Sequence, residues 1–163
     1  MDSSAYTFQK TVKEENQEIF DEDEYPRVLN YLWDHPDMRN LGLILMFVSG
    51  VRVGELAALK WEDITETHIK IRRTERRYEG DDGKYVFVIK ETPKTQAGIR
   101  EIALPASACT IFKRLRMMNP KGEYIFMEKG ERLKTFSFRN RLRDVCKKTC
   151  CVSKSPHKIR KTY

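Results

Sequence analysis

The amino-acid sequence predicts an α+β fold that is mainly helical, with a small three-stranded antiparallel sheet. Helical spacing of apolar residues occurs on either side of a central region, and short alternating strands lie in that region between residues 69 and 104. These strands follow one another without intervening helices, which favours α+β over a repeated βαβ order. The length of 163 residues suits one domain. We predict a polar linker or leader at residues 1–20 and a folded domain at residues 21–163.

Three helices are expected in the first part of the domain. The run Phe20–Glu24 offers an N-cap and acidic residues for a first turn, and His35-Pro36 ends that helix. A second helix is predicted over Met38–Val48. Ser49-Gly50 then interrupts the pattern, and a third helix is predicted from Val51 to about Lys60.

The centre of the chain carries the strand signals. Apolar and polar residues alternate over Ile69–Ile71 and again over Tyr85–Ile89. Gly80–Gly83 is rich in turn residues and separates these two strands. A third strand is predicted at Arg100–Leu104.

Helical spacing returns in the last third. One helix is predicted from Pro105 to Met118, and the apolar run Tyr124–Met127 is either a strand or a buried loop. A basic helix is predicted over Thr135–Cys151. Its apolar stripe consists of Phe136, Phe138, Leu142 and Val145. Ser155-Pro156 is a typical beginning for a further helix.

The formal net charge of +7 is unevenly distributed. Arg132–Lys161 holds eleven Lys or Arg and one acid, whereas Glu14–Glu24 holds seven acids and no base. A basic C-terminal half favours a nucleic-acid partner, and a merely solvated basic surface is the alternative.

Membrane insertion and secretion are disfavoured. The longest apolar run, Leu41–Val48, is too short to span a bilayer, and the N-terminus lacks the basic start and apolar segment of a signal peptide. We therefore expect a cytoplasmic protein. The four cysteines are Cys109, Cys146, Cys150 and Cys151. They form no paired C-x-x-C motifs, so reduced thiols are favoured over a zinc site that includes His157.

The run Ser49–Glu55 is a candidate anion site. If Ser49 or Gly50 caps a helix, Arg52 lies in its first turn, where the helix dipole is already positive, so the two features together suit an anion. Glu55 lies three residues further on the same face and can hold the guanidinium. Gly54 weakens a helix, which indicates close packing there. A surface Arg52–Glu55 ion pair is the alternative.

Two further candidates are weaker taken singly. His157 and Arg160, three residues apart on the helix that begins at Ser155-Pro156, share one face and can bind a phosphate. The alternative is an exposed histidine in a basic tail. Lys94 lies at a predicted hairpin tip, where it can reach a leaving oxygen or be an ordinary solvated lysine.

Three segments together resemble the catalytic domain of the tyrosine recombinases, the phage integrase family. Leu41–Ile64 contains a "GxRxxEL" motif and the Trp61-Glu62-Asp63 group, Pro93–Pro105 resembles the family's lysine hairpin, and His157–Arg160 resembles its "HxxR" motif. The resemblance covers about residues 20–163 and is nearest to integrases of phages and conjugative transposons.

The resemblance implies a role for each candidate. Arg52 and Arg160 would bind the scissile phosphate, and Glu55 would support Arg52. Lys94 would protonate the leaving 5′-oxygen, and His157 would assist phosphate binding or proton transfer. It also implies chemistry without a metal or other cofactor, double-stranded DNA as substrate, and a homo-oligomer on DNA in the full-length protein.

The family's tyrosine nucleophile is expected beyond the "HxxR" motif, after a further His or Trp. We therefore expect this chain to be a catalytic-domain fragment without its C-terminal part, unable to cleave DNA, with Tyr163 not serving as the nucleophile. The alternative functions are a type IB topoisomerase-like enzyme that relaxes DNA and a non-catalytic DNA-binding module.

Overall fold

The computed structural model describes residues 20–92, 99–149, 151 and 153–162, with side chains described up to Ile159. Within these ranges the helices are α2 Glu24–Asp34, α3 Met38–Ser49, α4 Val53–Ala57, the short 3₁₀ helix η1 Trp61–Asp63, α5 Ser107–Met118, α6 Thr135–Lys148 and α7 Pro156–Thr162. The strands are β1 His68–Ile71, β2 Arg73–Glu79, β3 Tyr85–Glu91, β4 Arg100–Ala103, β5 Met127–Glu128 and β6 Glu131–Arg132. The predicted linker lies almost wholly outside the described residues.

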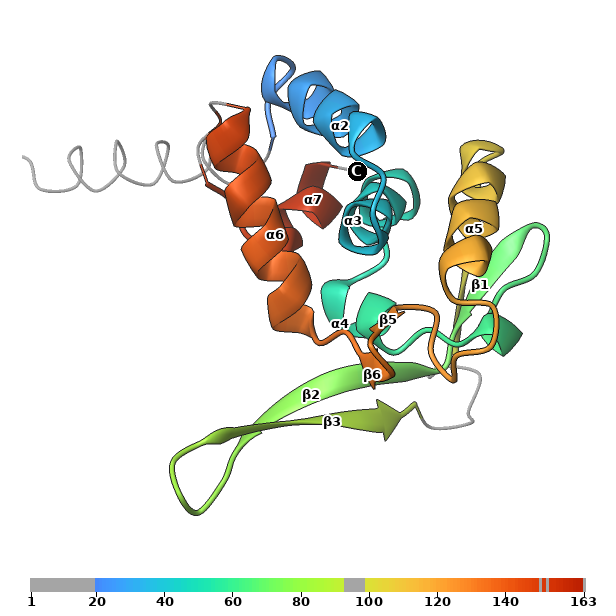
Figure 1. Ribbon diagram of the computed structural model, residues 1–163, viewed down its shortest axis with the longest axis vertical. Coiled ribbons are helices and arrows are strands. Elements are labelled where there is room, and N and C mark those ends of the chain that lie inside the picture. The colour runs from blue at the N-terminus through green and yellow to red at the C-terminus, as the bar shows by residue number, and fades with distance from the viewer. Residues whose placement is uncertain (1–19, 93–98, 150, 152, 163) are drawn as a thin grey trace, which may run out of the picture.

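Helix α3 is the centre of the fold. Every residue from Leu41 to Phe47 is buried, and α2, α5, α6 and α7 all pack against the helix (Figure 1). A helix that is apolar all round must be covered on every side, which explains its position. Asp37 caps its N-terminus through the backbone N–H of Asn40, at 2.8 Å. Gly50 ends it in the left-handed conformation, at φ 75°, which favours glycine.

The α+β class is confirmed, but the strands pair differently from the predicted single three-stranded sheet. They form three two-stranded antiparallel sheets among the described residues: β1 with β4, β2 with β3, and β5 with β6. Strand β2 follows β1 after Arg72 and pairs with β3 along its whole length. Its sequence, RTERRYE, has no apolar alternation, so the pattern gave no sign of it. The β2–β3 hairpin projects from the helices (Figure 1).

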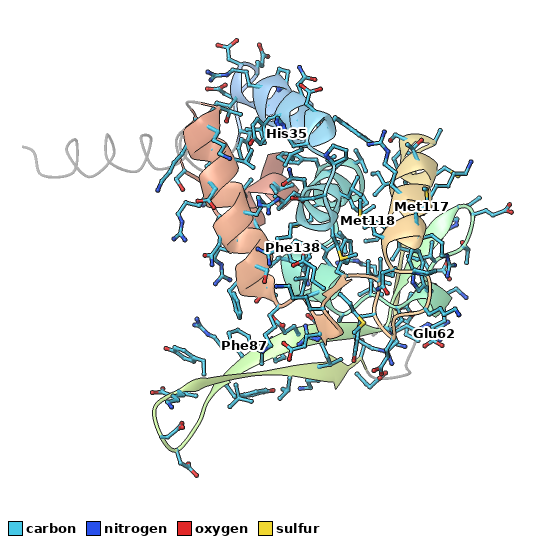
Figure 2. All side chains as sticks on the ribbon, viewed as in Figure 1. His35, Glu62, Phe87, Met117, Met118 and Phe138 are labelled. Atoms are coloured by element: carbon cyan, nitrogen blue, oxygen red, sulfur yellow. The ribbon has the colours of Figure 1, made fainter. Side chains whose placement is uncertain are left out.

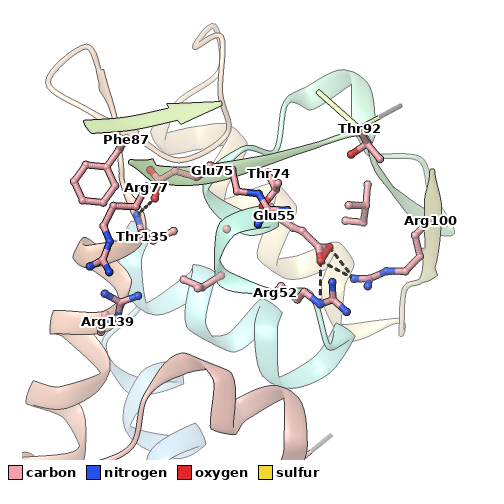
Figure 3. Close-up of a pocket in the computed structure, with 14 residues that line it drawn as sticks. Arg52, Glu55, Thr74, Glu75, Arg77, Phe87, Thr92, Arg100, Thr135 and Arg139 are labelled. Atoms are coloured by element: carbon pink, nitrogen blue, oxygen red, sulfur yellow. Dashed lines mark hydrogen bonds and ion pairs between the residues drawn. The ribbon is translucent and has the colours of Figure 1, made fainter. Parts of the chain in front are cut away.

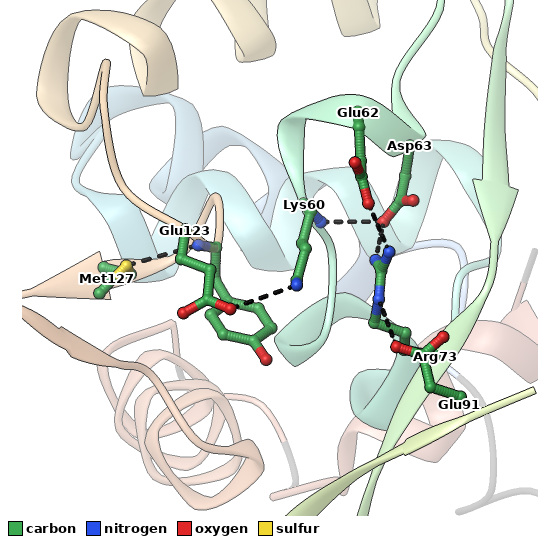
Figure 4. A network of polar contacts seen from close by, with 8 residues as sticks. Lys60, Glu62, Asp63, Arg73, Glu91, Glu123 and Met127 are labelled. Atoms are coloured by element: carbon green, nitrogen blue, oxygen red, sulfur yellow. Dashed lines mark hydrogen bonds and ion pairs between the residues drawn. The ribbon is translucent and has the colours of Figure 1, made fainter.

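The third helix is shorter than predicted. It was expected from Val51 to Lys60, but α4 has five residues and η1 follows it. Figure 4 shows the network that fixes this turn: Asp63 accepts the backbone N–H of Lys60 at 2.9 Å and pairs with Arg73 at 2.7 Å. Arg73 also pairs with Glu62 at 2.6 Å and Glu91 at 3.2 Å. Burial opposes the charged form of Arg73, but these carboxylates outweigh it and raise its pKa. The network therefore joins the β2–β3 hairpin to the helical part.

Helix α6 ends at Lys148, three residues before the predicted end. Phe138, Leu142 and Val145 are buried as expected, and Figure 2 shows Phe138 between α6 and α3. The prediction for Phe136 was wrong. Its side chain is exposed and lies edge-on to Phe87 of the hairpin, with ring centroids 5.4 Å apart. The hairpin therefore contacts the beginning of α6.

Candidate active site

An open pocket of about 650 Å³ lies where α4, the edge of β2 and the beginning of α6 meet (Figure 3). Two glutamates and five arginines line it, so cations outnumber anions on its wall. The lining residues are Arg52, Val53, Gly54, Glu55, Ile71, Thr74, Glu75, Arg76, Arg77, Phe87, Thr92, Arg100, Thr135 and Arg139.

Arg52 lies immediately before α4, as its N-cap residue, and not within the first turn as predicted. The reason is local: α3 ends at Gly50, and the chain runs extended through Arg52, at φ −76° and ψ 151°. Its side chain is 58% exposed, and its Nε lies 3.6 Å from Oε1 of Glu55. The guanidinium is thus held by Glu55 on its Nε side and lines the pocket.

Glu55 is buried, and it has a second arginine partner that sequence reasoning missed. Arg100 Nη2 donates to Oε2 of Glu55 at 2.7 Å and to Oε1 at 3.0 Å. The expected Glu55–Arg52 contact is present, but Glu55 also joins α4 to β4. The alternation of Arg100 and Ile102 with Glu101 and Ala103 was a usable signal, because it places Arg100 on the partly buried side of β4.

Gly54 allows α4 to approach β2 closely, as the sequence indicated. A Cβ at this position would lie 2.7 Å from Thr74 Oγ1 and 3.1 Å from the backbone oxygen of Glu75. Neither distance is an ordinary van der Waals contact. Because Gly54 has no side chain, α4 can pack directly against β2 at the wall of the pocket.

Glu75 connects β2 to α6 at the wall of the pocket. Its Oε2 accepts the backbone N–H of Thr135, the first residue of α6, at 3.0 Å, and its Oε1 pairs with Arg132 at 2.7 Å. A carboxylate at a helix N-terminus complements the helix dipole. Both acidic residues of the pocket are thus engaged, and Arg77 and Arg139 lie together at its α6 end (Figure 3).

Of the remaining candidates, only His157 has a described side chain. Lys94 lies outside the described residues. Helix α7 begins at Pro156 as predicted and packs between α6 and α3 with Ile159 buried (Figure 1). His157 is exposed on α7 and does not line the pocket. The backbone of Arg160 lies in α7, and its side chain is outside the described part.

The part of the chain that the structure describes contains no group of three His, Cys, Asp or Glu residues arranged to hold a metal. Cys109, Cys146 and Cys151 are free thiols, of which Cys146 is buried. No helix in the described ranges has the length and apolarity needed to cross a bilayer.

The sequence matches the Phage integrase family over residues 18–163. This match covers most of the chain, and the chain therefore belongs to that family. No curated protein matches the sequence.

Solved structures with a similar fold include recombinases. The Tn1549 transposon integrase, in complex with circular intermediate DNA, has a TM-score of 0.70 and 20% identity over 87% of this chain and 51% of its own. The XerA recombinase has a TM-score of 0.64 and 22% identity, covering 88% and 48%. Lambda integrase bound to DNA has a TM-score of 0.57 and 20% identity, covering 88% and 48%. The chain thus spans about half the length of these structures.

Proposed function

We propose that this chain is the catalytic-domain portion of a site-specific DNA recombinase, an integrase that breaks and rejoins DNA through a 3′-phosphotyrosine intermediate in its parent protein. The observation that carries the proposal is the exposed guanidinium of Arg52, held by the buried Glu55 in a pocket lined mainly by arginines. Membership of the phage integrase family and the fold shared with known recombinases support it.

The pocket suits a phosphodiester during transfer. Charge develops on the non-bridging oxygens of such a group, and donors fixed in advance stabilise that charge best. Arg52 has one nitrogen directed at Glu55, so its other N–H groups remain for a ligand. In the proposal Arg52 and Arg160 bind these oxygens, and Glu55 restrains Arg52. Lys94 donates a proton to the leaving 5′-oxygen, and His157 assists.

The proposed substrate is double-stranded DNA, and the proposed active form is a homo-oligomer of the parent protein on that DNA. Lambda integrase has been solved as a dimer and as a tetramer on DNA, which supports this proposal. Steep salt dependence of duplex binding is expected from a surface of this charge. A cytoplasmic location follows from the same proposal.

We assign the nucleophile to none of the seven tyrosines of this chain. The described tyrosines, Tyr25, Tyr31, Tyr78, Tyr85 and Tyr124, do not line the pocket that contains Arg52. Tyr163 lies outside the described residues and follows the "HxxR" motif too closely to match the family's order. On this proposal the chain alone binds DNA but forms no covalent adduct with it.

The test uses the parent protein and a nicked duplex that carries its recombination site and traps the covalent intermediate. Denaturing electrophoresis should show a protein–DNA band for the wild type and none for Arg52→Ala, while duplex binding by the variant falls only a few-fold. Normal cleavage by Arg52→Ala would refute the assignment. Relaxation of supercoiled plasmid without any such site, at a rate equal to site cleavage, would favour the topoisomerase alternative.

A further inference from the structure

A second group of arginines lies at the α6 end of the pocket, away from Arg52. Arg77 comes from β2, and Arg139 comes from the second turn of α6. Figure 3 shows Arg77 and Arg139 on one side of the pocket and Arg52 with Arg100 on the other. Thr74 and Glu75 lie between the two groups (Figure 3).

No acidic residue in the described part of the chain forms an ion pair with Arg77 or Arg139. The carboxylate nearest in sequence, Glu75, is engaged by Arg132 at 2.7 Å and by the Thr135 N–H at 3.0 Å. The guanidinium of Arg77 lies over the ring of Tyr85, at 4.3 Å, which fixes its orientation without neutralising it. Two exposed cations that lie together in one pocket repel each other, so an anion that binds between them is favoured.

The neighbouring surface suits the sugar and phosphate of a nucleotide chain. Phe87 lines the pocket beside these arginines, the exposed ring of Phe136 lies edge-on to it, and Lys134 Nζ is 5.9 Å from its centroid. Apolar rings flanked by guanidinium groups can contact a deoxyribose while the cations hold the adjoining phosphates. A single small anion at Arg52 would leave this whole end of the pocket unused.

We propose that Arg77 and Arg139 bind a second phosphodiester, one that does not react, on the same DNA strand as the phosphate bound by Arg52. Its function is to position the strand: a strand held at two phosphates cannot slide along the pocket, so the reactive phosphate stays at Arg52. This inference rests on the proposed function and extends it to the part of the substrate beside the reacting group.

The experiment measures binding of this chain to a fluorescein-labelled 30-base-pair duplex by anisotropy, over a series of salt concentrations. Each phosphate contact contributes close to one unit to the slope of log K against log salt. Arg77→Ala/Arg139→Ala should lower the magnitude of the slope by about one unit and weaken binding. Arg114→Ala is the control, because Arg114 is an exposed arginine on α5, outside the pocket. It should keep the wild-type slope.

A charge-conserving variant separates charge from packing. Arg77→Lys/Arg139→Lys should keep most of the slope, whereas a loss equal to that of the alanine variant would overturn the inference. Equal slopes for the alanine variant and Arg114→Ala would also overturn it, and would leave the proposed function intact. A wild-type chain whose duplex binding ignores salt would instead contradict the proposed function itself. Thermal unfolding of each variant confirms that the protein compared is folded.

Discussion

A single nitrogen of Arg100, Nη2, donates to both oxygens of Glu55, at 2.7 and 3.0 Å. The same carboxylate lies 3.6 Å from Arg52 Nε. Glu55 is thus shared between the guanidinium of Arg100 on β4, whose side chain is 37% exposed, and that of Arg52, whose side chain is 58% exposed. The orientation of Arg52 therefore depends on a strand that contributes nothing to the "GxRxxEL" motif.

Arg100→Ala in the parent protein should slow DNA cleavage at least about tenfold, with a less than about threefold change in duplex affinity. Without Arg100, Glu55 pairs with Arg52 alone and draws the guanidinium away from the phosphate, and small displacements of a catalytic group are costly. Single-turnover cleavage at saturating protein measures this. Arg114→Ala serves as the control. An unchanged rate would show that Arg100 does not position Arg52.

Arg73→Met should destabilise the fold by about 3–5 kcal/mol, because it leaves the carboxylate of Asp63 buried without its main partner. Arg72→Met is the matched control, since Arg72 is 40% exposed and lies 3.5 Å from the same Asp63, so its loss should cost less than about 1 kcal/mol. Urea denaturation of both variants provides the comparison. Equal losses would mean that burial does not decide the strength of this pair.

Gly54→Ala should destabilise the chain by about 1–3 kcal/mol, although alanine favours a helix by roughly 1 kcal/mol over glycine. The new Cβ would meet Thr74 Oγ1 at 2.7 Å. Thr74→Ala in the same chain should recover part of the loss, because it removes that oxygen. The backbone oxygen of Glu75, at 3.1 Å, remains and limits the recovery. Thermal melts of the two single variants and the double variant test this; strict additivity would argue against a direct contact.

Burial raises the pKa of the Cys146 thiol, and this has two consequences. In the native protein a thiol reagent should modify the exposed Cys109 well before Cys146, because the thiolate is the reactive form. At a pH above the ordinary thiol pKa, folded Cys146 keeps a proton that the unfolded chain has lost, so its contribution to stability falls as the pH rises.

The difference in unfolding free energy between wild type and Cys146→Ala isolates that contribution. It should be constant below about pH 8 and should shrink at higher pH. A difference that stays constant to pH 10 would mean that Cys146 does not titrate differently in the two states.

Most of the helical part of this fold was predictable from apolar residues at helical spacing and from residues that begin and end helices. Helices α2, α3, α5 and α7 begin within two or three residues of the expected positions, and Gly50 ends α3 as a glycine should. Strand β2 was not predictable in this way. Its buried positions are Arg73 and Glu75, and each forms an ion pair. The buried side of this strand is therefore charged, and a search for alternating apolar residues does not detect it.

The candidate site shows the same division. Arg52 and Glu55 lie three residues apart, so their contact followed from local geometry. Arg100 and Arg139 reach the pocket from elements that are distant in sequence. The spacing of residues in one sequence does not indicate which distant elements lie next to each other. Phe136 was placed in the core because it is apolar, whereas its ring lies outside the buried stripe of α6, against Phe87.

Glu75 ties the β2–β3 hairpin to α6 at the pocket. One carboxylate joins the middle of β2 to the first residue of α6, while Gly54 leaves no compressible side chain between α4 and β2. We therefore expect a displacement of the projecting hairpin to move α4 and α6 with it. Shortening this side chain by one methylene, as in Glu75→Asp, would change the distance between the two arginine groups without removing a positive charge from either.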